Sequence, residues 1–375
     1  MTAEVQKLGM PKWGLSMTEG RVVAWLVDEG ADISVGEEVA EVETEKINGA
    51  VESPVAGVLR RRVAEEGGVV PVGGLLGVVA DAGVPDADID AFIAEFQASF
   101  VPGETEEDAG PQPETVTVGA GTLRFLRQGE GGEPLVLLHG FGGDLNNWLF
   151  NLGPLAAERT VYALDLPGHG GSSKQVGDGD LGMLVGAVRE FLDSQGIERG
   201  HLAGHSMGGL VAAELALSDP DRVSSLSLVA PGGLGEEIDR EYVEGFVAAT
   251  GRRDLKPVLQ RLFADPDLVN RQMVDDVLKY KRLDGVQAAL STLAGRLFPE
   301  GRQARVLAPE LEDSSVPVLV IWGEADAIIP AAHAGAAPGR AETHVLPGVG
   351  HSPHMEAAGD VNRLLEGFVA GVRAG

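Results

Sequence analysis

Three side chains in the carboxyl-terminal half have types and an order that suit nucleophilic catalysis. Ser206 lies in the sequence Gly-His-Ser-Met-Gly, where the flanking glycines leave room for a strained turn between a strand and a helix. Asp326 and His351 each follow an apolar, strand-like run, at the edge where open parallel sheets place reactive groups. We therefore take Ser206 as a candidate nucleophile, His351 as its base and Asp326 as the acid that orients the base.

The serine motif alone is a weak signal in a chain with 53 glycines, so the neighbouring segments decide its weight. The apolar residues 135–138 run directly into a glycine-rich loop, residues 139–143, whose backbone amides can face an oxyanion. The amides of Phe141 and Met207 are the candidates for this oxyanion hole. The alternative for both is an ordinary glycine-rich strand-to-helix turn.

Other titratable residues near these motifs compete for roles or have structural ones. Glu324 is the rival of Asp326 as the orienting acid. His354 is expected to lie over the rim of a pocket or to pack, and His205 and His139 are expected to be structural or to line the pocket.

Lys46 is the candidate reactive group of the amino-terminal region. It lies between two strand-like arms in residues 41–52, so it is expected at the tip of a hairpin. An exposed lysine at a turn is by itself most often a solvated charge, although this chain has only seven lysines against 22 arginines. The chain has no cysteine, so any thiol chemistry has to come from an attached group.

Composition limits the classes of function. A length of 375 residues favours two domains, and 44% hydrophobic with 23% charged residues is typical of a soluble globular protein. The 57 acidic against 29 basic side chains disfavour binding to nucleic acid or to an anionic membrane surface. No run reaches the length of a membrane span, no signal peptide is evident and no metal site is expected, so we expect a cytoplasmic protein.

The elements that must position these residues divide the chain into two domains. Short valine-rich runs predict a small all-β domain over residues 1–80, and residues 115–375 alternate strands with helices, as in a mainly parallel α/β sheet. Residues 81–114 form an acidic linker with a short amphipathic helix over residues 89–100, which either packs on its own chain or docks a partner. Residues 234–310 are expected to form a helical cap.

The first 80 residues resemble the lipoyl domains of 2-oxo acid dehydrogenase E2 subunits. The turn Glu43-Thr44-Glu45-Lys46-Ile47 is similar to the turn that carries lipoate in that family, and Gly30 and Gly57 match its flanking glycines. The resemblance implies covalent lipoate on Lys46. Related biotinyl domains flank their lysine with methionines, and this turn has none.

Residues 121–375 resemble α/β-hydrolase fold proteins. The resemblance rests on His139-Gly140, on the segment from Asp165 to Gly170, on the serine motif, and on the segments ending in Asp326 and His351. It implies that Ser206 is the nucleophile, that His351 is general base and then acid, and that Asp326 holds the imidazole in one tautomer.

A lipoyl domain fused to such a fold resembles the E2 subunits of acetoin dehydrogenase complexes. This implies a dihydrolipoyllysine-residue acetyltransferase that passes acetyl groups to coenzyme A, with a thiamine-diphosphate E1 and a dihydrolipoamide dehydrogenase E3 as partners. The sequence lacks the His-x-x-x-Asp-Gly signature of ordinary E2 subunits and a basic subunit-binding domain, which leaves open how E1 and E3 are held and whether the chain forms a homo-oligomer. Two alternatives are an esterase or thioesterase with a lipoyl carrier, and a carrier whose hydrolase fold is idle.

Overall fold

The computed structural model describes residues 5–13, 17–44, 48–102 and 111–372. Contacts divide the chain into two compact units, Met1–Gln112 and Pro113–Gly375, each of which is described by itself. None of the helices in the described ranges is long and apolar enough to cross a membrane.

The first unit is built from two four-stranded antiparallel sheets. One has the order β1 (Gln6–Gly9), β8 (Leu75–Ala80), β6 (Gly57–Arg62), β3 (Asp32–Ile33), and the other β5 (Asn48–Glu52), β4 (Glu38–Glu43), β2 (Glu19–Trp25), β7 (Val69–Pro71). Both sheets contribute side chains to the core, among them the fully buried Leu8, Val22, Val42, Leu59 and Leu76. The expected small all-β fold is confirmed.

The hairpin that carries the candidate lysine joins β4 to β5. Its last paired residues are Glu43 and Asn48, which face each other across the two strands. Residues 45–47 between them, including Lys46, lie outside the described residues.

Helix α1 (Asp86–Ser99) belongs to the first unit and packs on β8. Ile89 is fully buried in a cluster with Leu75, Val78 and Val84, and Phe92, Ile93 and Phe96 pack against the same cluster. Arg60 of β6 holds the start of the helix through Asp86 at 2.9 Å. The sequence left open whether this helix packs on its own chain or docks a partner. The contacts of the described residues are those of packing within the chain.

The second unit is built around a single eight-stranded sheet. Its order is β16 (Glu342–Leu346), β15 (Val318–Gly323), β14 (Val223–Val229), β13 (Gly200–His205), β11 (Leu135–Leu138), β12 (Val161–Leu164), β10 (Gly121–Gln128), β9 (Glu114–Val118). Pairs from β12 to β16 are parallel, and β9 and β10 add an antiparallel edge. Every residue of β11 to β15 is buried, which a sheet covered on both faces requires. The expected α/β fold is thus confirmed.

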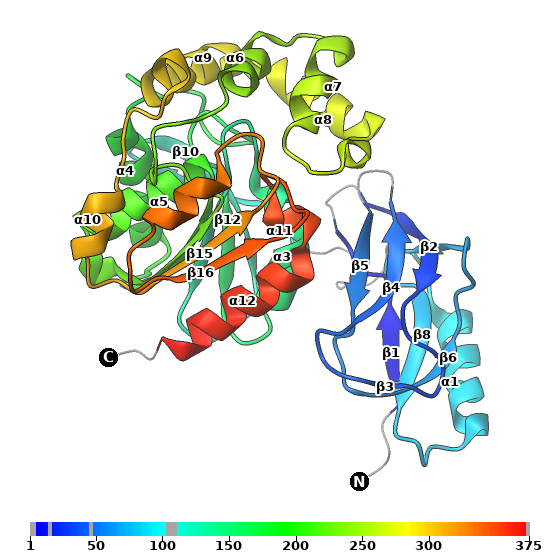
Figure 1. Ribbon diagram of the computed structural model, residues 1–375. Coiled ribbons are helices and arrows are strands. Elements are labelled where there is room, and N and C mark those ends of the chain that lie inside the picture. Colours follow the sequence, from blue (N-terminus) through cyan, green and yellow to red (C-terminus); the bar gives the residue numbers. More distant parts are fainter. Residues whose placement is uncertain (1–4, 14–16, 45–47, 103–110, 373–375) are drawn as a thin grey trace. The chain divides into compact units, whose positions relative to one another are not determined.

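Two groups of helices cover this sheet, and a third forms a cap. The first two groups are α3 (Leu149–Leu155) with α11 (Pro353–Glu356) and α12 (Ala358–Gly371), and α4 (Leu181–Ser194) with α5 (Met207–Ser218) and α10 (Ala308–Asp313). Between β14 and β15 the chain forms α6 (Arg240–Ala248), α7 (Arg252–Gln260), α8 (Arg271–Lys281) and α9 (Val286–Leu297). Figure 1 shows these four helices gathered on one side of the sheet, beyond the ends of its strands. They contact one another in the pairs α6–α7, α7–α8, α8–α9 and α6–α9, so the cap is a layer of its own.

Candidate active site

Ser206 occupies the turn between β13 and α5, with a backbone that few residues other than glycine adopt. Its φ of 52° and ψ of −117° are strained for a side chain with a Cβ atom. The flanking glycines are required by space, because a Cβ atom at Gly204 would lie 2.3 Å from the Gly208 carbonyl oxygen, and one at Gly208 2.3 Å from the Leu138 carbonyl oxygen. The local sequence therefore presents the serine on a sharp turn at the carboxyl end of β13.

The imidazole of His351 is hydrogen-bonded to Asp326. Nδ1 of His351 donates to Oδ2 of Asp326 over 2.8 Å, and both side chains are buried. Oδ2 also accepts from the Trp322 indole at 3.0 Å, and Oδ1 accepts from the backbone amides of Ile328 and Ile329 at 2.8 and 2.9 Å. Four donors thus fix the carboxylate, and because Nδ1 carries the proton, Nε2 of His351 is left as an acceptor.

His205 and Glu356 hold the loop that carries His351. Nε2 of His205, the residue before Ser206, donates to the backbone carbonyl of His351 at 2.8 Å. The Glu356 carboxylate accepts from the amides of Gly350 at 3.0 Å and Ala264 at 2.7 Å, the latter from the cap. Burial raises the pKa of Glu356. His205 thus has a structural role, one of the two expected from the sequence. Glu356 leaves no signal in the sequence, because its contact with Ala264 joins residues 92 positions apart.

The candidate oxyanion residues lie beside the serine. A Cβ atom at Gly140 would be 3.0 Å from the Cβ atom of Ser206, so the loop after β11 passes directly against it. Phe141 and Met207 are 5% and 1% exposed, and neither backbone N–H donates a hydrogen bond to any described residue. Buried, unpaired N–H groups are rare in folded proteins, and a site that stabilises an oxyanion needs them.

His139 orients one of these two amides. Its Nδ1 donates to the Gly140 carbonyl at 2.7 Å, and its Nε2 accepts from the Leu166 amide at 3.0 Å. The Gly140 carbonyl and the Phe141 N–H belong to one planar trans peptide and point in opposite directions. Burial lowers the pKa of His139, which favours the neutral ring that this pattern needs.

The cap fixes the same loop from its other side. Tyr242 of α6 donates its hydroxyl hydrogen to the Phe141 carbonyl at 3.1 Å. The Phe246 ring lies 5.8 Å from that of Phe141 and fills the space that a side chain at Gly142 would need. Lys281 of α8 caps the end of α6 through the carbonyls of Phe246 and Val247, and burial lowers its pKa to about 8.

The remaining candidates lie elsewhere. Glu324, the rival acid, is exposed, and no described contact joins it to His351. His354 is fully buried and packs between the rings of His205 and Trp148, at 4.4 and 4.5 Å. Burial lowers its pKa to about 3, so it is neutral and structural.

Both units match families of known proteins. The family described as alpha/beta hydrolase fold matches residues 133–358, and the family described as biotin-requiring enzyme matches residues 6–79. Two relatives span nearly the whole chain, and each is called a dihydrolipoyllysine-residue acetyltransferase component of acetoin cleaving system. The protein from Cupriavidus necator is 52% identical and covers 96% of both chains, and that from Pseudomonas putida is 53% identical over 98% of this chain and 99% of its own.

Solved structures resemble the second unit. A bacterial membrane phospholipase A is 28% identical with a TM-score of 0.62, over 71% of this chain and 88% of its own. A meta-cleavage product hydrolase from Pseudomonas fluorescens, 23% identical, has a TM-score of 0.64 over 69% of this chain and 98% of its own, and shows the fold alone.

Proposed function

We propose that this chain is the E2 component of an acetoin dehydrogenase complex. The chain belongs to the family of dihydrolipoyllysine-residue acetyltransferase components of acetoin cleaving systems. It carries acetyl groups on lipoyl-Lys46 and passes them to coenzyme A through Ser206, His351 and Asp326. The observation that carries the proposal is the presence, in one chain, of a lipoyl fold, of a strained serine beside two unpaired amides, and of a buried His–Asp pair whose loop is bound by His205, the residue before the serine.

The residues around position 46 suit covalent lipoate. β4 and β5 remain paired up to Glu43 and Asn48, and in the sequence Lys46 lies between these two residues, as in the turn that carries lipoate in lipoyl domains. When bound, the lipoyl group supplies the thiol that this cysteine-free chain lacks and holds the acetyl group as a thioester. Attachment to a tethered arm raises the local concentration of that thioester at the serine.

The first half of the reaction forms an acetyl-serine. His351 Nε2 takes the proton of the Ser206 hydroxyl while Oγ attacks the carbonyl carbon of the thioester, and the negative oxygen lies at the amides of Phe141 and Met207. His351 then gives the proton to the departing sulfur, and Asp326 stabilises the imidazolium that exists between these two steps.

The second half repeats these steps with a new acceptor. His351 removes the proton from the thiol of coenzyme A, whose sulfur attacks the acetyl carbon, and Oγ leaves with that proton as free Ser206. Water in place of the thiol would make the protein a thioesterase. The proposed partners are the thiamine-diphosphate E1, which loads the carrier, and the dihydrolipoamide dehydrogenase E3, which reoxidises it; the proposed compartment is the cytoplasm.

Intact mass spectrometry of the full chain, co-expressed with a lipoylation system, tests each step. With acetoin, E1 and coenzyme A, the wild type should gain an acetyl mass and lose it as acetyl-coenzyme A forms. Ser206→Ala should keep the acetyl mass, whereas Ser291→Ala, an exposed position on α9, should behave as wild type. Lys46→Arg should lack the lipoyl mass, and Lys12→Arg in the same domain should retain it.

Two results would refute the proposal. Loss of the acetyl mass without formation of acetyl-coenzyme A would make the protein a hydrolase. Unchanged transfer by folded Ser206→Ala would show that the hydrolase fold is not the transferase.

A further inference from the structure

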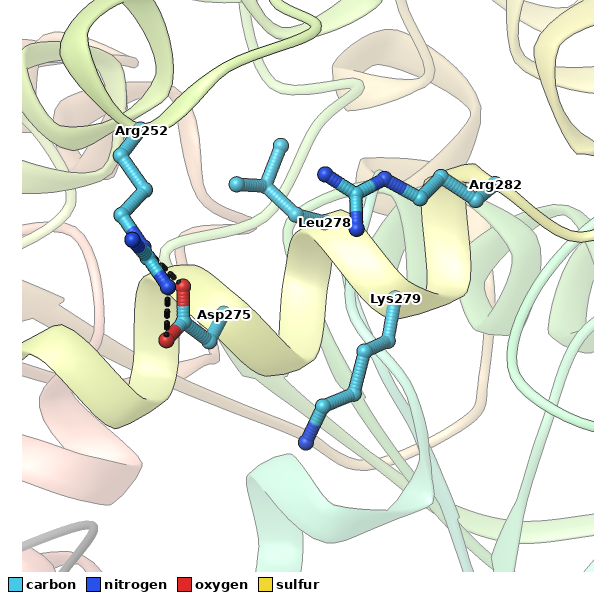
Figure 2. A pocket seen from close by; sticks show the side chains of 5 residues that line it. All are labelled: Arg252, Asp275, Leu278, Lys279 and Arg282. Carbon is cyan, nitrogen blue, oxygen red and sulfur yellow. Dashed lines mark hydrogen bonds and ion pairs between the residues drawn. The ribbon is translucent and has the colours of Figure 1, made fainter.

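A basic hollow of about 420 Å³ opens in the cap between the start of α7 and α8. Figure 2 shows its lining, in which Asp275, Leu278, Lys279 and Arg282 extend along α8 and Arg252 faces them from α7. The volume falls within the range of about 300–1,000 Å³ that is usual for small-molecule sites.

The charge of this part of the chain is opposite to that of the whole. Residues 252–282 hold eight basic and five acidic side chains, whereas the whole chain has 29 basic and 57 acidic ones. Within the hollow, both oxygens of Asp275 bind the Arg252 guanidinium, which also lowers the pKa of this carboxyl. Lys279 is paired with Asp276 at 3.0 Å. The Arg282 side chain makes no hydrogen bond or ion pair with a described residue, so its guanidinium is available to an anion.

The same helix borders the active-site loops. Tyr280 donates to the carbonyl of Gly168 at 2.7 Å, in the loop that follows β12. Lys281 binds the carbonyl of Phe246, whose ring packs on Phe141. A helix with its side chains is about 10–12 Å across, so a ligand in the hollow is separated from these loops by about one helix diameter.

We propose that the hollow binds the phosphate-bearing nucleotide end of coenzyme A, an inference that rests on the proposed acetyl transfer to this acceptor. A guanidinium group can bind two phosphate oxygens at once through parallel hydrogen bonds. Three of the five lining residues are cationic against one carboxylate, and Arg282, whose side chain has no partner among the described residues, is the one that meets a phosphate first. The buried Leu278 gives the hollow an apolar floor, which suits the base of a nucleotide. The thiol at the other end of coenzyme A lies on a flexible arm and is then free to reach Ser206.

Transfer from soluble S-acetyldihydrolipoamide to three acceptors separates this proposal from the proposed function. Coenzyme A carries all the phosphates, dephospho-coenzyme A lacks one, and pantetheine lacks every one. The full-length wild type should prefer them in that order by kcat/KM. Arg282→Ala should raise KM for coenzyme A about tenfold, the effect of one charged hydrogen bond, and should lower the preference for coenzyme A over pantetheine by the same factor.

Arg296→Ala is the matched control, because Arg296 is also an exposed cap arginine without a described partner but lies on α9 outside the hollow. It should leave the preference unchanged. Isothermal titration with adenosine 3′,5′-bisphosphate should show binding by the wild type and weaker binding by Arg282→Ala.

Other results would overturn the inference. If wild type used coenzyme A and pantetheine equally, or if Arg282→Ala lowered kcat/KM for both together, the hollow would not recognise the nucleotide, although acetyl transfer would stand. If Arg282→Ala slowed transfer only from a lipoylated protein donor, the hollow would be a docking surface for an acidic carrier. If no thiol accepted the acetyl group, the proposed function itself would fail.

Discussion

Replacing Asp326 by asparagine should abolish acyl transfer by changing the tautomer of His351. All four groups that bind the Asp326 carboxylate are donors, two on each oxygen. An asparagine oxygen can serve one pair, but its NH2 group then faces the other pair. If the oxygen stays with the amides of Ile328 and Ile329, the NH2 group donates to Nδ1 of His351 and moves the imidazole proton to Nε2. A protonated Nε2 cannot accept the serine proton, and a loss of about 10⁴-fold in kcat, or about 5.5 kcal/mol of barrier, is expected.

The assay is single-turnover transfer from S-acetyldihydrolipoamide to coenzyme A, together with urea unfolding. Asp326→Asn should lose about 1–3 kcal/mol of stability, since the Trp322 indole loses an acceptor in a buried site, and should remain folded. Glu324→Gln is the matched control, because that carboxylate is exposed, and it should retain activity and stability. Loss of activity in Glu324→Gln with an active Asp326→Asn would refute the assignment of the acid.

Three further predictions concern the turn and the cap. Gly208→Ala should reduce stability by about 3 kcal/mol in urea unfolding, because the new Cβ atom would lie 2.3 Å from a backbone oxygen in an overpacked turn. Tyr242→Phe removes the hydrogen bond to the Phe141 carbonyl; it should lower kcat about tenfold with little change in KM and cost about 1 kcal/mol of stability, and a change in KM alone would contradict the role in orienting the loop. The pKa of Lys281 in the folded protein, about 8, lies below its ordinary value of 10.5, so the folded state binds fewer protons than the unfolded state between these values. The free energy of unfolding of the wild type relative to Lys281→Met should therefore rise from pH 8 to 10.5 in parallel denaturant titrations, and a fall would contradict the assignment.

The parts of the fold that could be predicted from sequence are those that local residues determine. Uninterrupted apolar runs such as residues 135–138 predict buried strands, and the glycines that flank Ser206 predict the strained turn found at the end of β13. Strand β14 begins at Val223, three residues before Leu226, although Ser224 and Ser225 interrupt its apolar run; the hydroxyl groups of these serines have partners that are distant in sequence. Ser225, for example, binds His201 of the neighbouring strand at 2.8 Å. Polar residues in a buried strand are recognised only when their partners are known.

The supporting contacts of the site could not be predicted for a related reason. Tyr242 and Phe141 are 101 residues apart, and His205 and His351 are 146 apart, so neither pair leaves a periodic pattern in the sequence. Both contacts depend on how loops and cap helices meet over the ends of the strands. Likewise, the basic hollow exists because α7 and α8 pack together, whereas the sequence shows only a cap of nearly balanced charge.

In the proposed mechanism, burial of the site affects whether the acetyl-serine reacts with a thiol or with water. Ser206, His351 and the two candidate oxyanion residues, Phe141 and Met207, are each at most 6% exposed, and α6 lies against the loop that holds one of the amides. Such a site admits a slender arm more readily than a nucleotide. Phosphates held on the cap would contribute binding energy far from the reacting carbon, and that energy keeps the thiol at the acetyl group in preference to a passing water molecule. Binding the nucleotide on the cap surface while the thiol reacts in the buried site would thus favour transfer to coenzyme A over hydrolysis, in a fold that is shared with hydrolases.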